Sequence, residues 1–245
     1  MTLLVNEKKI VVPGEEIAEG MDFLPAKGTY RDGDKIISAQ LGLVNVNGRL
    51  IRVMPLTGRY IPKVGDTIIG KIVNITMNGW LVDIGYAYEA FLTLKEGTTE
   101  FVERNEDLSK YYDFEDIIVA KIINVSKSKS IDLTTKGPGL RKLNNGRIIN
   151  VTPSKVPRII GKQGSMITLV KDATQCRITV GQNGVVWLQG EPEQEIKAIE
   201  AIKMIDEKAH IEGLTDEMKK FLGYEGKPKD FEVEDVGEEN EREDN

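Results

Sequence analysis

Short apolar runs alternating with polar residues dominate the start of the chain. Residues 35–39 and 49–54 are rich in Ile and Val, and residues 32–34 and 45–48 before them are typical of hairpin turns. Such runs are too short for stable helices and suit half-buried strands. The pattern therefore predicts a small all-β module over residues 1–60, and no set of catalytic side chains stands out in it.

Two longer apolar runs, residues 64–75 and 116–125, resemble each other. Each carries a lysine at the same place, Lys71 or Lys121, and each is followed by a polar turn. Between them, residues 78–85 contain an Asn-Gly turn that leads into an alternating strand. Residues 61–140 are therefore expected to form a five-stranded antiparallel barrel of the OB type.

The third segment, residues 141–212, mixes strand and helix patterns. Pro153 and Pro157 bound a short first helix, and a Gly-x-x-Gly turn separates it from a second helix. The pattern predicts an α+β unit in the order strand (147–151), short helix, turn, helix (165–174), two strands (177–180 and 185–188) and a long final helix.

The final helix of this unit begins near Pro192. Glu193 and Glu195 lie in its first turn and Lys208 near its end, where their charges suit the helix dipole. We expect its buried stripe to consist of Ile196, Ile199, Ile202 and Ile205. The remaining residues, 213–245, predict a short helix over 214–222 and then a disordered tail.

Charge is distributed unevenly along the chain. The net charge is −6, but residues 230–245 hold nine acidic residues and one basic residue, a net of −8, which leaves +2 for the rest. An acidic tail with few apolar residues is typical of disorder, and solubility is its simplest role. Residues 141–171 instead contain seven Lys or Arg and no Asp or Glu. This run predicts a basic patch of the kind that binds RNA.

The most specific chemistry in this basic run is the turn from Gly161 to Gly164. Two glycines three residues apart allow a sharp turn and a close approach by phosphate, and the next helix offers unpaired N–H groups. Lys162 adds a cation at the tip. We predict an RNA-backbone clamp made by Lys155, Arg158, Ile160, Gly161, Lys162, Gln163, Gly164 and Ser165.

The barrel segment holds eight of the fifteen aromatic residues: Trp80, Tyr86, Tyr88, Phe91, Phe101, Tyr111, Tyr112 and Phe114. Bases can stack on exposed rings, at about 1–3 kcal/mol per base. Each ring could instead fill the barrel, and Phe91 and Phe101 are the first candidates for that role. Lysines on or near the closing strand, including Lys121, Lys127, Lys129 and Lys136, could contact phosphate. The predicted RNA contacts of the barrel are Lys71, Trp80, Tyr86, Tyr88, Lys121 and Lys127.

Several kinds of site are not expected. The single cysteine, Cys176, and the single histidine, His210, exclude a disulfide framework, a cysteine zinc site and a histidine cluster. We expect Cys176 to be a small buried side chain and His210 to lie at a helix end, with no metal or cofactor bound. No run approaches the ~18 apolar residues of a membrane span, and the first residues lack the pattern of a secretory signal. We therefore expect a cytoplasmic protein.

Two of the segments resemble known RNA-binding domains. The third resembles a type I KH domain through Gly161 and Gly164, which implies that the turn grips the backbone of about four nucleotides. The second resembles an S1 domain through residues 64–66, 70–72 and 78–85. It has Asn78 and Leu81 where that family commonly has aromatic residues, so Trp80, Tyr86 and Tyr88 would have to replace the usual stacking face.

The order of the segments resembles the RNA-binding cap subunits of the exosome, and the archaeal form in particular. The resemblance covers about residues 10–210. It implies that three cap copies sit on a ring of RNase PH-like subunits, that the N-terminal module docks on this ring, and that the S1 domains line the entry pore. It also implies that the cap captures single-stranded RNA without performing chemistry.

Two alternative functions share these domains. Polynucleotide phosphorylase also ends in S1 and KH domains, but no part of these residues has the length or the pattern left over for its catalytic domains. Transcription and ribosome-associated factors can carry an S1 domain followed by KH units. They typically have two KH units, whereas one Gly-x-x-Gly unit is visible here.

Overall fold

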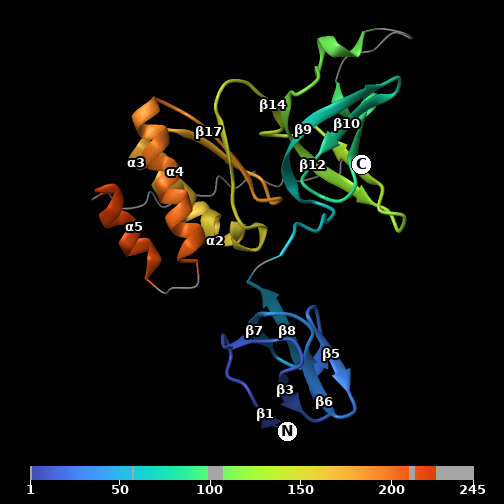
Figure 1. The fold of residues 1–245 in the computed structure, drawn as a ribbon, viewed down its shortest axis with the longest axis vertical. Coiled ribbons are helices and arrows are strands. Elements are labelled where there is room, and N and C mark those ends of the chain that lie inside the picture. The colour runs from blue at the N-terminus through green and yellow to red at the C-terminus, as the bar shows by residue number, and fades with distance from the viewer. Residues whose placement is uncertain (1, 57, 99–106, 210–212, 225–245) are drawn as a thin grey trace, which may run out of the picture.

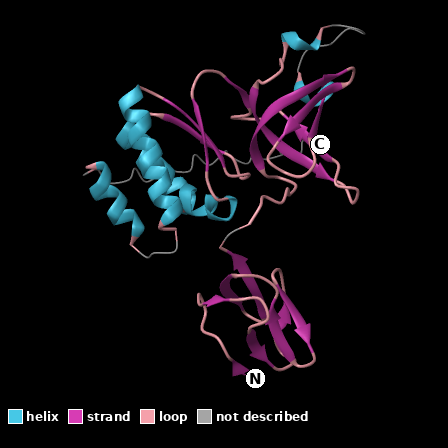
Figure 2. Cartoon of the chain, viewed as in Figure 1, coloured by secondary structure: helices cyan, strands magenta, loops and turns pink. Residues whose placement is uncertain are grey.

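The computed structural model describes residues 2–56, 58–98, 107–209 and 213–224. The chain forms three units, and Figure 1 shows the first of them joined to the other two by an extended segment. Figure 2 shows that strands dominate the first two units and that most of the helices belong to the third. The expected fold class, an all-β module, an OB barrel and an α+β KH unit, is confirmed.

The N-terminal unit consists of two four-stranded sheets that enclose a core of valine and isoleucine side chains. Gly33 and Gly48, both with φ of +59°, begin two-residue turns that join neighbouring strands, as the hairpin patterns predicted. One sheet has the order β1 (Thr2–Leu3), β3 (Glu16–Glu19), β6 (Lys35–Ser38), β5 (Thr29–Asp32). The other has the order β2 (Ile10–Val11), β7 (Gly42–Asn47), β8 (Leu50–Pro55), β4 (Leu24–Pro25).

The second unit is a closed five-stranded barrel. Its two long strands are those predicted from the matching apolar runs, and they pair antiparallel. The strands follow the order β9 (Thr67–Thr76), β10 (Gly79–Asp83), β11 (Ala90–Thr93), β13 (Ile131–Thr134), β12 (Ile117–Val125), and β12 returns to β9. The barrel also carries α1 (Leu94–Gly97), the 3-10 turn η1 (Leu108–Lys110) and β14 (Arg141–Leu143), which pairs with β12.

The third unit is a three-stranded antiparallel sheet with helices on one face. Its helix α3 (Ser165–Thr174) has the predicted bounds, while Pro157 lies inside the first turn of α2 (Val156–Ile160) and does not limit it. The sheet order is β15 (Arg147–Asn150), β17 (Val185–Gln189), β16 (Arg177–Val180). The other elements are η2 (Pro153–Lys155), η3 (Lys162–Gly164), α4 (Pro192–Glu207) and α5 (Leu214–Leu222).

Helix α5 packs into the core of the third unit. Leu214, Met218 and Leu222 are buried together with side chains of α3 and α4. The helix predicted over 214–222 is therefore part of the same folded body as the KH fold. Cys176 is buried in this core, as expected.

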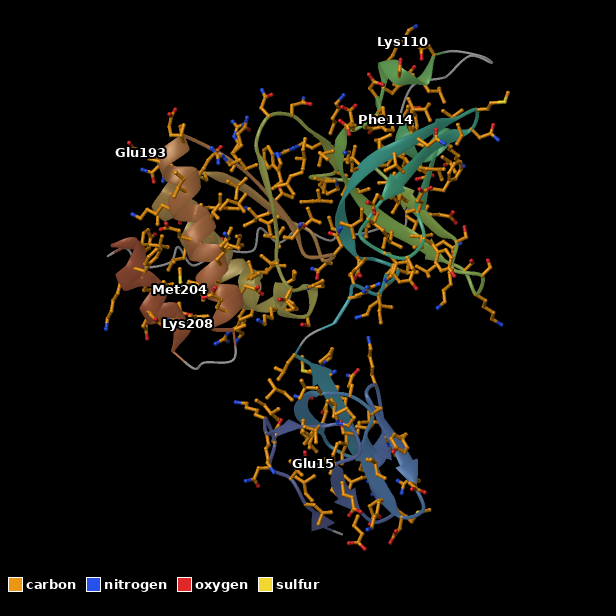
Figure 3. The ribbon with its side chains drawn as sticks, in the orientation of Figure 1. Glu15, Lys110, Phe114, Glu193, Met204 and Lys208 are labelled. Atoms are coloured by element: carbon orange, nitrogen blue, oxygen red, sulfur yellow. The ribbon has the colours of Figure 1, made fainter. Side chains whose placement is uncertain are left out.

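The predicted buried stripe of α4 is partly wrong. Ile202 and Ile205 are fully buried, but Ile196 is 51% exposed. Residues three apart drift by about 60° around a helix at each step, so Ile196 and Ile205 point to opposite sides. The buried side chains of α4 are instead Glu195, Ala198, Ala201, Ile202 and Ile205. Figure 3 shows Glu193 and Lys208 at opposite ends of this helix, as the dipole argument expected.

The barrel and the KH unit share a buried interface. Trp187 of β17 points away from the KH helices and packs against Ile69 and Val119 of the barrel, together with Leu143. The turn before β17 adds hydrogen bonds, because the buried Asn183 side chain donates to the carbonyl oxygens of Ile69 (2.7 Å) and Ile84 (3.0 Å). The same side chain accepts a bond from the Ile69 backbone N–H at 3.2 Å. These contacts join the two units into one body.

Candidate nucleic-acid interface

The Gly-x-x-Gly turn between α2 and α3 depends on its two glycines for different reasons. Gly161 has φ of +77° and ψ of 174°, and a Cβ there would lie 2.7 Å from the backbone nitrogen of Met166. Gly164 has φ of +79°, but its Cβ would meet nothing closer than Thr168 Oγ1 at 4.0 Å. Gly161 is therefore required by conformation and by space, whereas Gly164 is required by conformation alone.

The tip of this turn faces solvent. Lys162, Gln163 and Ser165 are exposed, and Gln163 adopts a left-handed conformation with φ of 52°. No side chain caps the start of α3. The first N–H groups of α3 are thus left without a side-chain acceptor next to an exposed lysine, and this arrangement favours a phosphate group.

The basic run around the turn is less positive in the fold than in the sequence. Lys155 donates to the main-chain oxygen of Asp206 at 2.6 Å and lies 3.8 Å from its carboxylate. Arg147 pairs with the buried Glu195 at 2.7 Å, and Lys142 pairs with a carboxylate of the barrel. Three predicted cations are therefore engaged by acids from distant segments. Lys162 is exposed at the tip of the turn, and Arg158 is exposed on α2 just before it.

Lys171, in the second half of α3, is half-buried. Burial lowers the pKa of its ammonium below the usual value, and the neighbouring carboxylate of Asp172 offsets part of this effect. This basic residue belongs to the packing of the helix and lies outside the turn.

Trp80 was predicted to stack on bases, and that prediction is wrong. Its side chain is 0% exposed in the barrel core, and its Nε1–H donates to the Tyr112 carbonyl oxygen at 2.9 Å. Tyr112 also packs edge-on against the indole, with ring centres 5.1 Å apart. Because successive strand residues face opposite sides, Trp80 points inward opposite Leu92 and its neighbour Leu81 points outward.

Phe91 shows the opposite departure from expectation. The sequence made it a first candidate for filling the barrel, yet it lies between the buried Ala90 and Leu92 and is only partly buried. It pairs across the strands with Leu81 on the outer face. An aromatic ring on strands 2 and 3 of an OB barrel lies on the face that commonly binds oligonucleotides. The strand register could have revealed that Phe91 faces outward. Trp80 pairs with Leu92, so the residue before Leu92, Phe91, lies on the opposite face of the hairpin.

Of the other predicted barrel residues, Tyr86 is partly buried against the barrel core and the rest are exposed. Tyr86 and Tyr88 follow β10, with ring centres 6.0 Å apart at a 58° tilt, and Tyr88 is 55% exposed. Lys121 and Lys127 are exposed, whereas Lys71 pairs with Glu115 at 2.8 Å. Phe114 is also exposed and is labelled in Figure 3. Phe101, His210 and the acidic tail lie outside the described residues.

Within the described ranges, no group of His, Cys, Asp and Glu side chains is arranged to hold a metal ion. None of the described helices is both long and apolar enough to cross a membrane.

Three family models match successive segments of the chain. They describe the exosome RNA-binding protein RRP4 N-terminal domain (residues 8–57), the RRP4 S1 domain (59–109) and the KH domain (146–204). A Thermococcus kodakarensis protein named exosome complex component Rrp4 is 46% identical over 224 residues, which cover 90% of this chain and 87% of that protein. The chain belongs to the Rrp4 family.

Other members of the Rrp4 family are similarly close. The Pyrococcus abyssi protein is 45% identical over 224 residues, covering 90% of this chain and 84% of its own length. The Methanothermobacter thermautotrophicus protein is 43% identical over 220 residues, covering 90% and 70% respectively. A crystal structure described as that of an exosome complex RNA-binding protein has a TM-score of 0.62 and 34% identity, and covers 68% of this chain and 96% of that one. The resemblance inferred from the order of the segments is thus confirmed.

Proposed function

We propose that this chain is a non-catalytic RNA-binding subunit of the exosome that captures single-stranded RNA. The observation that carries the proposal is the solvent-exposed Gly161–Gly164 turn, which is followed by a helix without a side-chain cap. The unit that carries this turn packs against the S1 barrel. Membership of the Rrp4 family supports the assembly. Three copies would cap a ring of RNase PH-like subunits in the cytoplasm, with the N-terminal unit docked on the ring.

Within this proposal the two RNA-binding surfaces have different roles. The KH turn holds the sugar-phosphate backbone through Gly161, Lys162, Gln163, Gly164 and Ser165, with Arg158 and Ile160 beside them. The barrel offers Tyr86, Tyr88 and the outward Phe91 for stacking, with Lys121 and Lys127 for phosphate. Two weak sites on one rigid body raise the effective concentration of a strand that already occupies one of them. Such a body would guide a 3′ end toward a phosphorolytic chamber.

The turn is tested by the double substitution Lys162→Asp with Gln163→Asp. Both side chains are exposed and neither glycine is altered, so the fold is preserved, and aspartate tolerates the left-handed conformation at position 163. We expect the affinity for a single-stranded RNA to fall at least about tenfold and the salt dependence to weaken by about 0.7 per lost phosphate contact. Fluorescence anisotropy at several salt concentrations measures both.

The matched control is Lys203→Asp, at an exposed lysine on α4. It changes the net charge in the same direction without touching the turn, so its effect should be small. Equal loss in the control and the double variant, or no loss in either, would contradict the clamp.

Docking is tested separately by native mass spectrometry of the chain with co-purifying proteins. Recovery of RNA polymerase or ribosomal subunits in place of a nuclease ring would favour the transcription or ribosome-associated alternative.

A further inference from the structure

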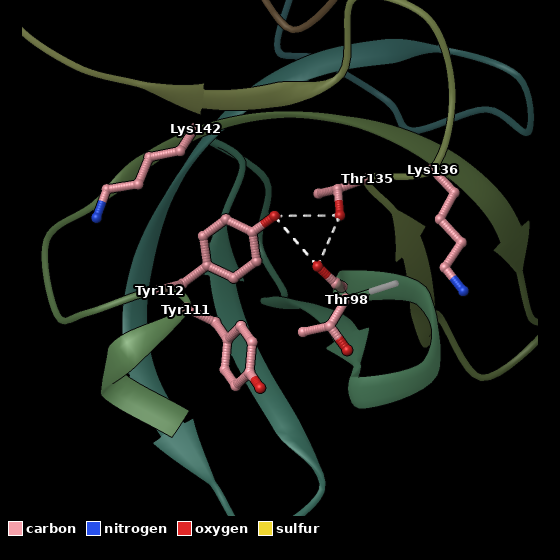
Figure 4. Close-up of a pocket in the computed structure, with 7 residues that line it drawn as sticks. Thr98, Tyr111, Tyr112, Thr135, Lys136 and Lys142 are labelled. Atoms are coloured by element: carbon pink, nitrogen blue, oxygen red, sulfur yellow. Dashed lines mark hydrogen bonds between the residues drawn. The ribbon is translucent and has the colours of Figure 1, made fainter. Parts of the chain in front are cut away.

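A pocket of about 360 Å³ opens beside α1, on the barrel (Figure 4). The buried indole of Trp80 packs against two of its lining residues, because Trp80 Nε1–H donates to the Tyr112 carbonyl oxygen and a Cβ on Gly97 would lie 2.6 Å from the Trp80 ring. The lining residues of the pocket come from α1 and β14 and from the segments that follow α1, η1 and β13, whereas Phe91 lies on β11. Its volume lies in the range of sites that take small ligands. It is lined by Gly97, Thr98, Tyr111, Tyr112, Thr135, Lys136 and Lys142.

The hydroxyl groups in this pocket have more acceptors than protons. The Tyr112 hydroxyl lies 3.3 Å from the Gly97 carbonyl oxygen and 3.2 Å from Thr135 Oγ1. Thr135 Oγ1 in turn lies 3.1 Å from the Glu96 carbonyl oxygen and 3.2 Å from that of Gly97. Each hydroxyl carries one proton and can donate one full bond at a time. A ligand hydroxyl, which both donates and accepts, would complete this network.

The walls of the pocket also carry two lysine side chains and two tyrosine rings. The amines of Lys136 and Lys142 lie on either side of the two tyrosines (Figure 4). Lys142 pairs with the Asp116 carboxylate, while Lys136 is exposed. A lysine amine offers three donors, so even the paired one keeps capacity for phosphate. The hydroxyl network matches a ribose and the lysine amines match a phosphate. The two lining tyrosines, which pack edge-on against Trp80, add aromatic surface for the third part of a ribonucleotide, the base.

We propose that this pocket is a ribonucleotide subsite, in which a ribose 2′-hydroxyl joins the Tyr112–Thr135–Gly97 network and the adjacent phosphate lies at Lys136. The inference rests on the proposed RNA-binding function and deepens it, because the 2′-hydroxyl distinguishes RNA from DNA. The Gly161–Gly164 turn grips backbone phosphate, which both polymers share. The barrel pocket would thus give the subunit its preference for RNA.

The test compares RNA and DNA oligonucleotides of the same sequence by fluorescence anisotropy with the full chain. Thr135→Val keeps the side-chain shape and removes the hydroxyl, and Tyr112→Phe removes the other donor. Loss of one hydrogen bond should weaken RNA binding by about three- to tenfold and leave DNA binding unchanged, so the RNA preference falls. Lys136→Gln should weaken both polymers alike, and Lys95→Gln, at an exposed lysine of α1, should weaken neither.

A wild-type chain that binds RNA and DNA equally, or hydroxyl variants that keep the full RNA preference, would overturn the subsite and leave the proposed function standing. A wild-type chain that binds neither polymer would overturn both. Circular dichroism of each variant confirms that the barrel remains folded. Because Thr135→Val and Tyr112→Phe remove different hydroxyl groups, either variant alone can test the subsite if the other one does not fold.

Discussion

At the scale of single residues, burial and pairing decide what each charge does. Lys155, Arg147 and Lys142 all belong to the basic run, yet each is held by an acid from another segment of the chain. Such pairs offset these positive charges locally, while the exposed Lys162 keeps its charge available. A count of charges along the chain therefore overstates the cations that a ligand can reach.

Lys171 provides a test of burial at this scale. Its pKa is lowered in the folded protein, so its charge destabilises the fold at neutral pH. We expect Lys171→Met to raise the free energy of unfolding at pH 7, by less than about 1 kcal/mol because partial exposure screens the cost. Urea unfolding measures the change.

The lowered pKa of Lys171 determines how the stability of the wild type changes with pH. The folded protein loses the Lys171 proton before the unfolded chain does, so the wild type gains stability as pH rises from the lowered pKa toward 10.5. The advantage of Lys171→Met should therefore shrink in that window. An advantage that grows with pH would contradict the assignment.

At the scale of elements, alternation decides which aromatic residue is core and which is surface. Along β10 and β11, Trp80 and Leu92 face inward while Leu81 and Phe91 face outward. A shift of one residue in register would exchange these roles. The same reasoning at a period of 3.6 residues explains why Ile196 leaves the buried stripe of α4.

The two aromatic residues should respond differently to substitution by leucine. Trp80→Leu leaves a cavity and an unpaired Tyr112 carbonyl, so we expect it to lower the free energy of unfolding by about 3 kcal/mol. Phe91→Leu should cost less than about 1 kcal/mol and weaken RNA binding several-fold through lost stacking. Urea unfolding measures the stability of both variants, and anisotropy titrations measure their RNA binding. A larger stability loss in Phe91→Leu than in Trp80→Leu would show that the register has been misassigned.

At the scale of the whole molecule, the barrel and the KH unit form one body. The apolar contact of Trp187 with Ile69 and Val119, and the bonds of Asn183, cross the interface between them. Gly181 permits this approach, because a Cβ there would lie 2.8 Å from the Ile69 nitrogen. The Gly161–Gly164 turn and the barrel surface are therefore held at a fixed separation.

This coupling predicts one calorimetric transition for the barrel and the KH unit together. Asn183→Ala leaves two buried carbonyl groups without their donor, at about 1–3 kcal/mol each, and should separate that transition into two. Asn74→Ala, at an exposed position of β9, should keep the single transition and change the free energy of unfolding by less than about 0.5 kcal/mol. A single, unshifted transition in Asn183→Ala would show that the interface does not couple the units.

The sequence alone determined the three units, most element bounds in the KH unit and the position of the Gly-x-x-Gly turn. Those features depend on periodicity, turn residues and glycine conformations, which are local properties of the chain. Only the tertiary structure decided which cations are paired, that Trp80 is core and Phe91 surface, and that Asn183 joins two units. These depend on strand register and on contacts between residues as many as 114 positions apart, which no local pattern encodes.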